Sequence, residues 1–222
     1  MSGECRVRNA EWKPQCVCFA VKEEARPFHR LAGNWPGCKV LLTGMGRRNA
    51  ERAIRAALAL EKPGRVLSCG FAGGLDPSLP AGTVLFAADQ LPGLEAALLA
   101  AGARKGSFHC VGRVAATAED KKVLRAATGA DAVEMESQWI CAVCAEQNVP
   151  AATVRVILDT ASQDLPLDFN LLMNADQEMS YARLALSLAK APWKIGAMLK
   201  LQKASANAAE ALGRVLERIV VR

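Results

Sequence analysis

The sequence has few of the side chains on which several common kinds of site depend. Its 222 residues include two histidines, His29 and His109, and one tyrosine, and aromatic residues make up 5% of the chain. We therefore expect neither a histidine-based catalytic triad nor a histidine-rich metal site. With so little to stack on bases, and with no nucleic-acid-binding motif, we expect no nucleic-acid partner.

Long apolar runs are absent as well. No stretch reaches the roughly 18 residues that span a bilayer, and residues 1–14 lack the apolar core of a signal peptide. Hydrophobic residues make up 51% of the chain, which is too many for a disordered protein. The net charge of +6 permits an anionic partner, but a mildly basic enzyme surface explains it equally simply. We expect one cytoplasmic domain that spans residues 1–222.

Eight cysteines are present, but their positions do not indicate disulfide bonds or a metal centre. Cys18, Cys69 and Cys144 lie within apolar strand or helix patterns, where a free cysteine behaves as a small core residue. Cys141 and Cys144 have the spacing of zinc ligands, yet they lie inside a predicted helix without a second pair or a nearby histidine. Since zinc needs about four ligands, we expect no metal and no bound cofactor.

Short apolar runs alternate with helical patterns along most of the chain. Strands that alternate with helices form a mostly parallel sheet covered on both faces. We therefore predict a single-domain α/β three-layer sandwich with a mostly parallel, mixed β-sheet flanked by helices. The predicted strands are residues 15–20, 38–43, 65–70, 82–88, 107–114 and 151–158. Helices are predicted from residue 22, at 50–60, around 94–101, after a capping-box-like start at Thr117, and from Met135 to Val143.

A basic segment follows a loop-like stretch at residues 164–176. Helical patterns at 177–190 and 192–221 make residues 177–222 a C-terminal basic helical segment. Its cations Lys190, Lys194, Lys200, Lys203, Arg214, Arg218 and Arg222 are accompanied by Glu210 and Glu217, and Trp193, Ile195, Met198 and Leu199 supply apolar surface. Basic amphipathic helices can lie on anionic membranes, although more often they pack on their own domain with solvated charges. Peripheral membrane contact therefore stays open.

The strongest indication of a site lies between residues 132 and 159. Two carboxylates flank a methionine in Glu134-Met135-Glu136, and the apolar strand at 151–158 ends on a lone acid, Asp159. Open α/β sheets bind their ligands at the carboxyl ends of parallel strands. We therefore expect a site that includes these acids.

Three other strand ends could contribute to that site. Glu23 and Glu24 follow the first strand, either complementing a helix dipole or pointing into the site. A glycine turn followed by two arginines comes after the second strand, where it either changes the chain direction or binds an anion through Gly46, Arg47 and Arg48. The third strand is followed by Phe71, Ala72, Gly73 and Gly74, where a ligand or a packed element can approach the backbone.

Five motifs at these strand ends resemble, in order and spacing, those of the nucleoside phosphorylase and nucleosidase family. They are AVKEEA at 20–25, TGMGRRNA at 43–50, SCGFAGGL at 68–75, VEMES at 133–137 and VRVILD at 154–159. Purine nucleoside phosphorylase, uridine phosphorylase and the nucleosidase acting on methylthioadenosine and S-adenosylhomocysteine belong to this family. Residues 117–137 and the C-terminal helix look closest to its hopanoid-associated phosphorylase-like branch, whose proposed substrate is an adenosine with a large lipid at its 5′ position.

The resemblance implies a role for several of the residues above. Asp159 matches the general acid that protonates purine N7, and Glu24 matches the glutamate that positions or deprotonates the attacking water. Glu136 matches the acceptor of the ribose hydroxyls, and Met135 matches the methionine that packs on the sugar. Phe71, Ala72 and Gly73 are expected beside the substrate. Glu134 is interpreted as a solvated or helix-start acid that does not contact the substrate.

Several positions depart from the family pattern. Ser68 and Phe71 stand where phosphorylases carry an arginine and a small hydroxyl residue that contact phosphate. The segment 89–107 is short, and no aromatic residue follows Thr117, where relatives place one that stacks on the base. A phenyl ring cannot donate a hydrogen bond and would crowd a phosphate, which favours water as the nucleophile.

The leading hypothesis is therefore hydrolysis of the N-glycosidic bond of an adenosine-like purine nucleoside. One alternative is phosphorolysis to ribose 1-phosphate, with inorganic phosphate as co-substrate and a 5′-lipid adenosine as a candidate substrate. Another is a nucleoside-binding protein that has lost turnover. Since relatives are dimers, trimers or hexamers, a homo-oligomer is also expected.

Overall fold

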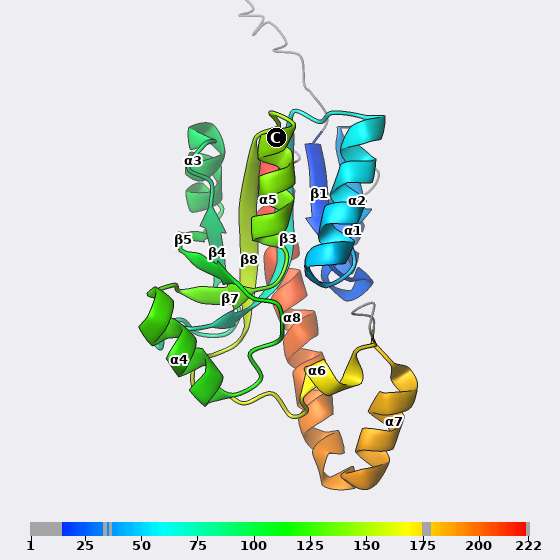
Figure 1. Ribbon diagram of the computed structural model, residues 1–222. Helices are drawn as coiled ribbons and strands as arrows, with labels where there is room; N and C mark the ends of the chain where they lie inside the picture. Colours follow the sequence, from blue (N-terminus) through cyan, green and yellow to red (C-terminus); the bar gives the residue numbers. More distant parts are fainter. Residues whose placement is uncertain (1–14, 33–34, 36, 175–178, 221–222) are drawn as a thin grey trace, which may run out of the picture.

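A mixed sheet runs through the middle of the protein in the computed structural model, which describes residues 15–32, 35, 37–174 and 179–220 (Figure 1). The strands are β1 (Gln15–Phe19), β2 (Cys38–Leu42), β3 (Arg65–Gly74), β4 (Val84–Ala87), β5 (Arg104–Lys105), β6 (Phe108–Cys110), β7 (Ala132–Glu134) and β8 (Ala151–Asp159). The main path of the sheet is β2-β1-β3-β8-β4-β5, and β7 joins β3 to β6. Strands β1, β2, β3 and β8 are parallel, whereas β4 runs antiparallel to β8 and β7 antiparallel to β3.

Helices cover both faces of this sheet. They are α1 (Lys22–Ala32), α2 (Gly46–Leu60), α3 (Pro92–Ala100), α4 (Ala118–Thr128), α5 (Ser137–Glu146), α6 (Phe169–Leu172), α7 (Tyr181–Lys190), the 3-10 turn η1 (Pro192–Lys194) and α8 (Ile195–Val220). One core cluster joins α1, α3 and α8 to the sheet, and a second joins α2 and α5 to its other face. The predicted α/β three-layer sandwich is confirmed.

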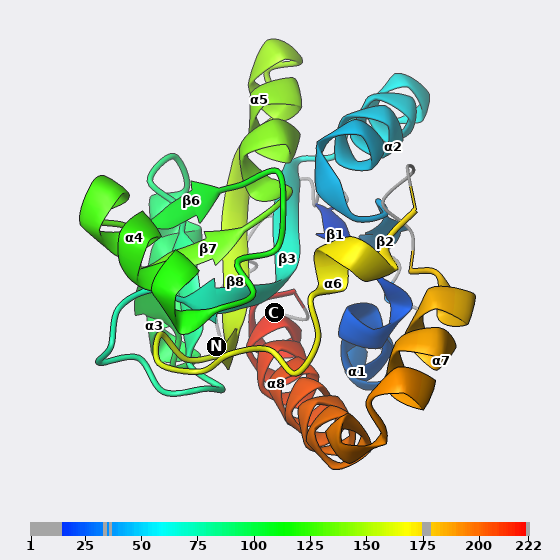
Figure 2. The same ribbon diagram turned by 60° about the horizontal axis from the view of Figure 1, so that its bottom comes forward.

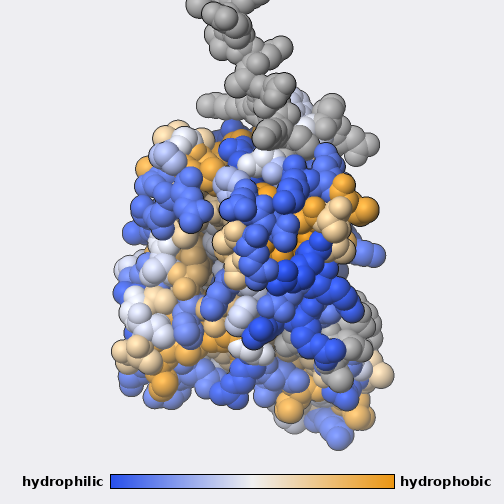
Figure 3. Space-filling view, turned by 45° about the horizontal axis from the view of Figure 1, so that its top comes forward, coloured by the Kyte–Doolittle hydropathy of each residue, from blue (hydrophilic) through white to orange (hydrophobic). Residues whose placement is uncertain are grey.

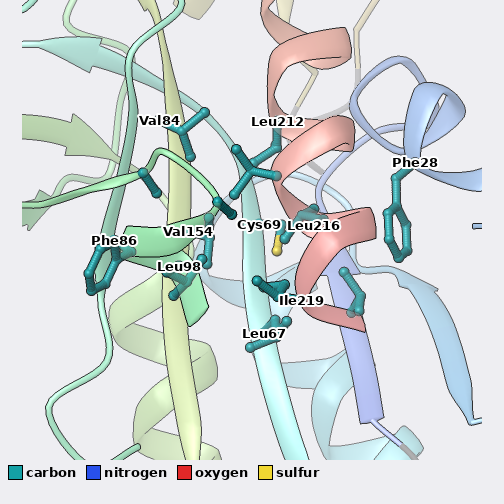
Figure 4. Close-up of a cluster of buried hydrophobic side chains, with 14 of the residues drawn as sticks. Phe28, Leu67, Cys69, Val84, Phe86, Leu98, Val154, Leu212, Leu216 and Ile219 are labelled. Carbon is teal, nitrogen blue, oxygen red and sulfur yellow. The ribbon is translucent and has the colours of Figure 1, made fainter. Parts of the chain in front are cut away.

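The second half of α8 supplies much of the larger core cluster. In Figure 4, Leu212, Leu216 and Ile219 lie against Leu67, Cys69 and Val154 of the two central strands. Leu212, Leu216 and Ile219 recur at helix spacing, so they form one apolar face. The second half of α8 is therefore part of the domain core, while its first half, up to Asn207, is largely exposed.

Alternation along β8 decides which of its side chains can reach a site. Val154 and Val156 belong to the cluster that α8 covers. Successive side chains of a strand point to opposite faces, so Arg155 between them points to the other face of the sheet. Arg155 nevertheless stays buried, which requires partners for its charge.

Most of the predicted elements exist, and several boundaries differ. α2 begins at Gly46, four residues before the predicted start. The prediction missed the first turn because that turn is polar and shows no apolar periodicity. β3 continues through the glycines to Gly74, and the strand predicted at 107–114 is reduced to Phe108–Cys110. β7 was not predicted, since three residues are too few to show a period. Predicted helix residues 177, 178 and 221 lie outside the described residues.

Two further findings bear on the predictions. Cys18, Cys69 and Cys144 are buried core residues, as predicted. Among the described residues, no helix is both long and apolar enough to cross a membrane.

Candidate active site

The acids predicted from the sequence lie in two groups near the carboxyl ends of β1, β3 and β8. One group surrounds Arg155, and the other consists of Asp159 and Lys121. Figure 2 shows how the fold separates the surrounding elements, with α4, β6 and β7 on one side of β3 and with α1, α6 and α7 on the other.

Arg155 is the centre of the first group, and its side chain is 1% exposed. Its Nη2 donates to Glu134 Oε2 at 2.7 Å and to Ser68 Oγ at 3.2 Å, and its Nη1 donates to the Cys69 carbonyl at 3.2 Å. Glu136 Oε2 lies 3.5 Å from the same Nη2. The buried Nε has no hydrogen-bond partner among the described residues. Because an unpaired buried donor is costly, the Arg155 group is not fully satisfied by the described residues.

Glu134 anchors the helix that follows it. Its carboxylate accepts hydrogen bonds from the backbone of Glu136 and Ser137, at 2.9 and 2.8 Å, and from the Ser137 hydroxyl at 2.7 Å. Burial alone would raise the pKa of Glu134, but the Arg155 guanidinium and these hydrogen bonds outweigh burial and lower it. The interpretation of Glu134 as a helix-start acid is confirmed, but that of a solvated acid is wrong.

Glu136 lies between the glycine turn and Arg155. Its Oε1 accepts a hydrogen bond from the Gly46 backbone at 2.9 Å, which fixes the carboxylate at the start of α2. Burial raises the pKa of Glu136 to about 7, with Arg155 opposing the shift and Glu134 adding to it. The Glu136 carboxyl group therefore keeps its proton to a higher pH than a solvated glutamate does.

Glu24, rather than Glu23, points into the protein, since Glu23 is exposed and Glu24 is buried. Its Oε2 accepts from the Ala20 and Val21 backbone at 3.0 and 3.2 Å. Its Oε1 accepts from the Phe71 backbone at 2.8 Å, so Glu24 ties the end of β1 to β3. Burial raises the pKa of Glu24 against the opposing effects of Arg155 and the backbone donors.

A glycine makes the meeting of Glu24 and Arg155 possible. A Cβ on Gly70 would lie 2.5 Å from Arg155 Nη1 and 2.7 Å from Glu24 Oε1, and the residue has a φ of +149°. Any other side chain would displace both charged groups and strain the backbone. Gly70 was not among the predicted site residues, although it lies within the SCGFAGGL motif.

The second group lies where β8 ends. Ala72 pairs with Ile157 and Gly73 pairs with Asp159, so a bulge leaves Leu158 without a partner and changes the direction of the residues after it. Asp159 Oδ2 forms an ion pair with Lys121 Nζ of α4. A Cβ on Gly73 would lie 3.5 Å from the same Oδ2, which places this glycine beside the pair.

Lys121 was not predicted as a site residue, and its side chain is fully buried. Besides Asp159, its Nζ donates to the carbonyls of Thr160 and Gln163, at 2.9 and 2.7 Å, so all three N–H groups have acceptors. Burial raises the pKa of Asp159, while the charge and hydrogen bond of Lys121 oppose that shift. Asp159 is thus both desolvated and held by a cation.

The other predicted residues lie around these groups in different ways. Phe71 and Met135 are half-buried, and Ala72 is buried in a small core cluster. Arg47 stacks over Trp139, 4.1 Å from the ring centroid, and pairs with Glu51, while Arg48 is exposed. Since the Gly46 N–H already donates to Glu136, the anion site proposed for Gly46, Arg47 and Arg48 gains no support from this geometry.

Comparison with known proteins finds the same family that the motifs resemble. Residues 12–96 and 91–191 match the model of the phosphorylase superfamily. Over 174 residues the chain is 27% identical to a 5′-methylthioadenosine/S-adenosylhomocysteine nucleosidase of Glaesserella parasuis serovar 5 (strain SH0165), covering 64% of this chain and 76% of that protein.

Two solved structures share the fold. The nucleosidase of the same name from Campylobacter jejuni has a TM-score of 0.68 at 16% identity, covering 93% of this chain and 98% of its own. The futalosine hydrolase of Helicobacter pylori strain 26695 has a TM-score of 0.64 at 17% identity, covering 94% and 99%.

Proposed function

The chain belongs to the phosphorylase superfamily, and on this premise we propose that it hydrolyses the N-glycosidic bond of an adenosine-like purine nucleoside and releases the base. The nucleosidase relative and the two hydrolytic enzymes that share the fold support an enzyme of the N-glycosidase type.

The observation that carries the proposal is the charge of the Arg155 group. Glu134 and Glu136 form ion pairs with one guanidinium, and the charge of Glu24 also acts on it, so three carboxylates lie near a single cation. Such a site repels a phosphate dianion but admits a neutral water molecule. It also favours the positive charge that develops on the ribose as the glycosidic bond breaks, because oxocarbenium character places a cation near carboxylates.

The ribose is proposed to bind at Glu136. The Gly46 N–H holds one carboxylate oxygen in place, and a vicinal diol can donate to both oxygens. These donors favour the ionised carboxylate, so substrate binding lowers a pKa that burial has raised to about 7. Met135, half-buried next to Glu136 in the chain, is proposed to pack on the sugar.

The attacking water is proposed to be positioned by Glu24. Its backbone hydrogen bonds fix the carboxylate, and Oε1, which accepts only the bond from Phe71, can accept a further bond. A carboxylate whose pKa is raised by burial is a better proton acceptor at neutral pH than a solvated one. The Phe71 backbone N–H already donates a hydrogen bond to Glu24, and the Phe71 ring has no hydrogen-bond donor for a phosphate.

The leaving base is proposed to receive its proton from Asp159. Asp159 and Lys121 together hold one transferable proton, which lies on the Lys121 nitrogen in the ion pair and on the Asp159 oxygen when the acid is neutral. When the base leaves, Asp159 delivers that proton to purine N7 and remains a carboxylate beside a neutral Lys121, and solvent returns a proton to the pair after the product has left. Proton transfer of this kind contributes roughly 100-fold or more to a rate.

An assay with and without phosphate tests the proposal. The protein is incubated with adenosine, methylthioadenosine and a 5′-lipid adenosine, and free base and sugar product are separated and measured. We expect base and free sugar without phosphate. Release that requires phosphate and yields ribose 1-phosphate would contradict hydrolysis. Binding without any release would instead identify a nucleoside-binding protein.

A matched pair of variants tests the nucleophile. Glu24→Gln keeps the shape of the side chain but removes the charge that accepts a proton from water, and we expect base release to fall while nucleoside binding persists. Glu23→Gln, one residue earlier and exposed, is the control and should leave both unchanged. Equal activity of the two variants would remove Glu24 from the mechanism.

A further inference from the structure

Exposed apolar side chains gather on one part of the molecule that the proposed chemistry does not use. We call residues 182–207 the C-terminal hairpin; it comprises most of α7, η1 and the first half of α8. Leu186, Trp193, Ile195 and Leu199 in it are 56%, 76%, 46% and 60% exposed. Figures 1 and 2 show α7 and the first half of α8 side by side, extending beyond the sheet. The hairpin therefore presents apolar surface that the domain itself does not bury.

The charge of the same region has one sign. From Met179 to Ala209 the sequence contains no aspartate or glutamate, whereas Arg183, Lys190, Lys194, Lys200 and Lys203 are cationic. The first acid after this stretch, Glu210, pairs with Arg30 of α1 and so belongs to the body of the domain. Elsewhere the surface is mixed, as on the face in Figure 3, where hydrophilic and hydrophobic areas alternate.

Helix geometry places cations beside the apolar side chains. Residues four apart lie on one face of a helix, so Ile195, Leu199 and Lys203 share a face of α8. On α7, Leu186 and Lys190 have the same spacing. Trp193 lies in the turn between the helices and is the most exposed of these apolar residues. Apolar side chains flanked by lysines suit an interface in which the apolar groups are buried and the ammonium groups meet anions.

We propose that the C-terminal hairpin docks on an anionic lipid surface. Trp193, Ile195 and Leu199 would enter the boundary between headgroups and acyl chains, where tryptophan is favoured, and the lysines would contact lipid phosphates. A second copy of the chain is the less suitable occupant. A two-fold interface puts the same patch on both sides, so it would bring the five cations of each copy together without one acid.

Vesicle binding by the full chain tests this proposal. We expect it to sediment with vesicles of phosphatidylcholine and phosphatidylserine, less so at high salt, and much more weakly with phosphatidylcholine alone. The emission of Trp193 should shift to the blue on binding, and Trp193→Phe should remove that shift. No binding to the anionic vesicles, or equal binding to both kinds, would overturn the proposal.

Two pairs of variants separate the apolar and electrostatic contributions. Leu199→Ser should weaken binding about tenfold, whereas Leu60→Ser on α2, where Leu60 is 82% exposed, should not. Converting Lys190, Lys194, Lys200 and Lys203 to glutamine should weaken it about 100-fold or more. The control with the same net charge converts the exposed Lys22, Lys39, Lys62 and Lys122 and should keep most of the binding.

The result that would favour self-association instead can be recognised directly. If sedimentation velocity finds an oligomer that Leu199→Ser dissociates, and the vesicles do not bind, the hairpin is a contact between copies and the lipid proposal is wrong. Base release from a water-soluble nucleoside is measured for the same variants. We expect no change, because the hairpin residues lie outside the proposed site, so the two proposals can fail separately.

Discussion

The Arg155 group and the pair of Asp159 and Lys121 use opposite arrangements of charge. Around Arg155, two carboxylates form ion pairs with one cation, a third, Glu24, acts on it through its charge, and an arginine nitrogen has no partner among the described residues. At the end of β8, one carboxylate meets one ammonium group whose donors are all used. Both groups are buried, so their electrostatic interactions are screened little by solvent.

The difference matches the two things that glycosidic cleavage requires. An excess of negative charge suits a sugar that becomes cationic, and it leaves Glu136 with a pKa of about 7. A neutral pair suits a proton that must be held until the base leaves. Variants that break one arrangement at a time separate the two roles, and their expected effects range from a loss of stability to a shift of a pH profile.

Arg155→Met should destabilise the protein by about 3–5 kcal/mol at neutral pH, because it leaves buried carboxylates without their cation. Denaturant unfolding measures the change. The double variant Arg155→Met with Glu134→Gln should recover part of the loss, since Glu134 is the closest carboxylate. If Arg155→Met unfolds at the same denaturant concentration as the unaltered protein, the shared cation does not hold the group together.

Asp159→Asn should reduce base release by a factor of about 100 or more, because the amide cannot supply the proton. Asp89→Asn is the matched control, since Asp89 is exposed and forms its ion pair with Lys105. Thermal unfolding of both variants checks that the fold is intact. A folded Asp159→Asn protein with full activity would exclude Asp159 from the chemistry.

Stability should fall as pH rises from about 4.5 to about 7 because of Glu136. Its pKa is raised from 4.5 to about 7 in the folded protein. Between these values the folded state binds more protons than the unfolded state, so the free energy of unfolding decreases with pH. The contribution lost is at most about 3 kcal/mol. Glu136→Gln should flatten the dependence measured by denaturant unfolding from pH 4.5 to 8; an unchanged slope would contradict the raised pKa.

Sequence reasoning identified the acids better than their partners. Asp159 was found because it ends an apolar strand, and Glu136 because it matches a family motif. Local sequence patterns do not distinguish Glu23 from Glu24, since both lie in the first turn of α1. The structure decides it, because Glu24 reaches the Phe71 backbone on β3, a contact between residues 47 positions apart.

The cations were missed for physical reasons that differ. Arg155 interrupts an apolar run, and a charged residue in a buried strand must have partners, so its position did contain a usable signal. Lys121 offered none, because the adjacent Lys122 has the same local sequence surroundings yet is exposed. Its burial depends on the carbonyls of Thr160 and Gln163, about forty positions later in the chain.

Lys121→Met should have the smallest effect of these variants, and that effect should be confined to the pH dependence of base release. Burial raises the pKa of Asp159 and Lys121 opposes that shift, so removing the lysine should raise the pKa further. The protonated acid then persists to higher pH, and the alkaline limb of the pH profile of base release should move to higher pH. Lys122→Met, on the exposed side of α4, is the matched control. A loss of activity at all pH values without a shift of the limb would mean that Lys121 only holds the loop of Thr160 and Gln163. A shift of the limb would instead show that Lys121 controls the proton on Asp159.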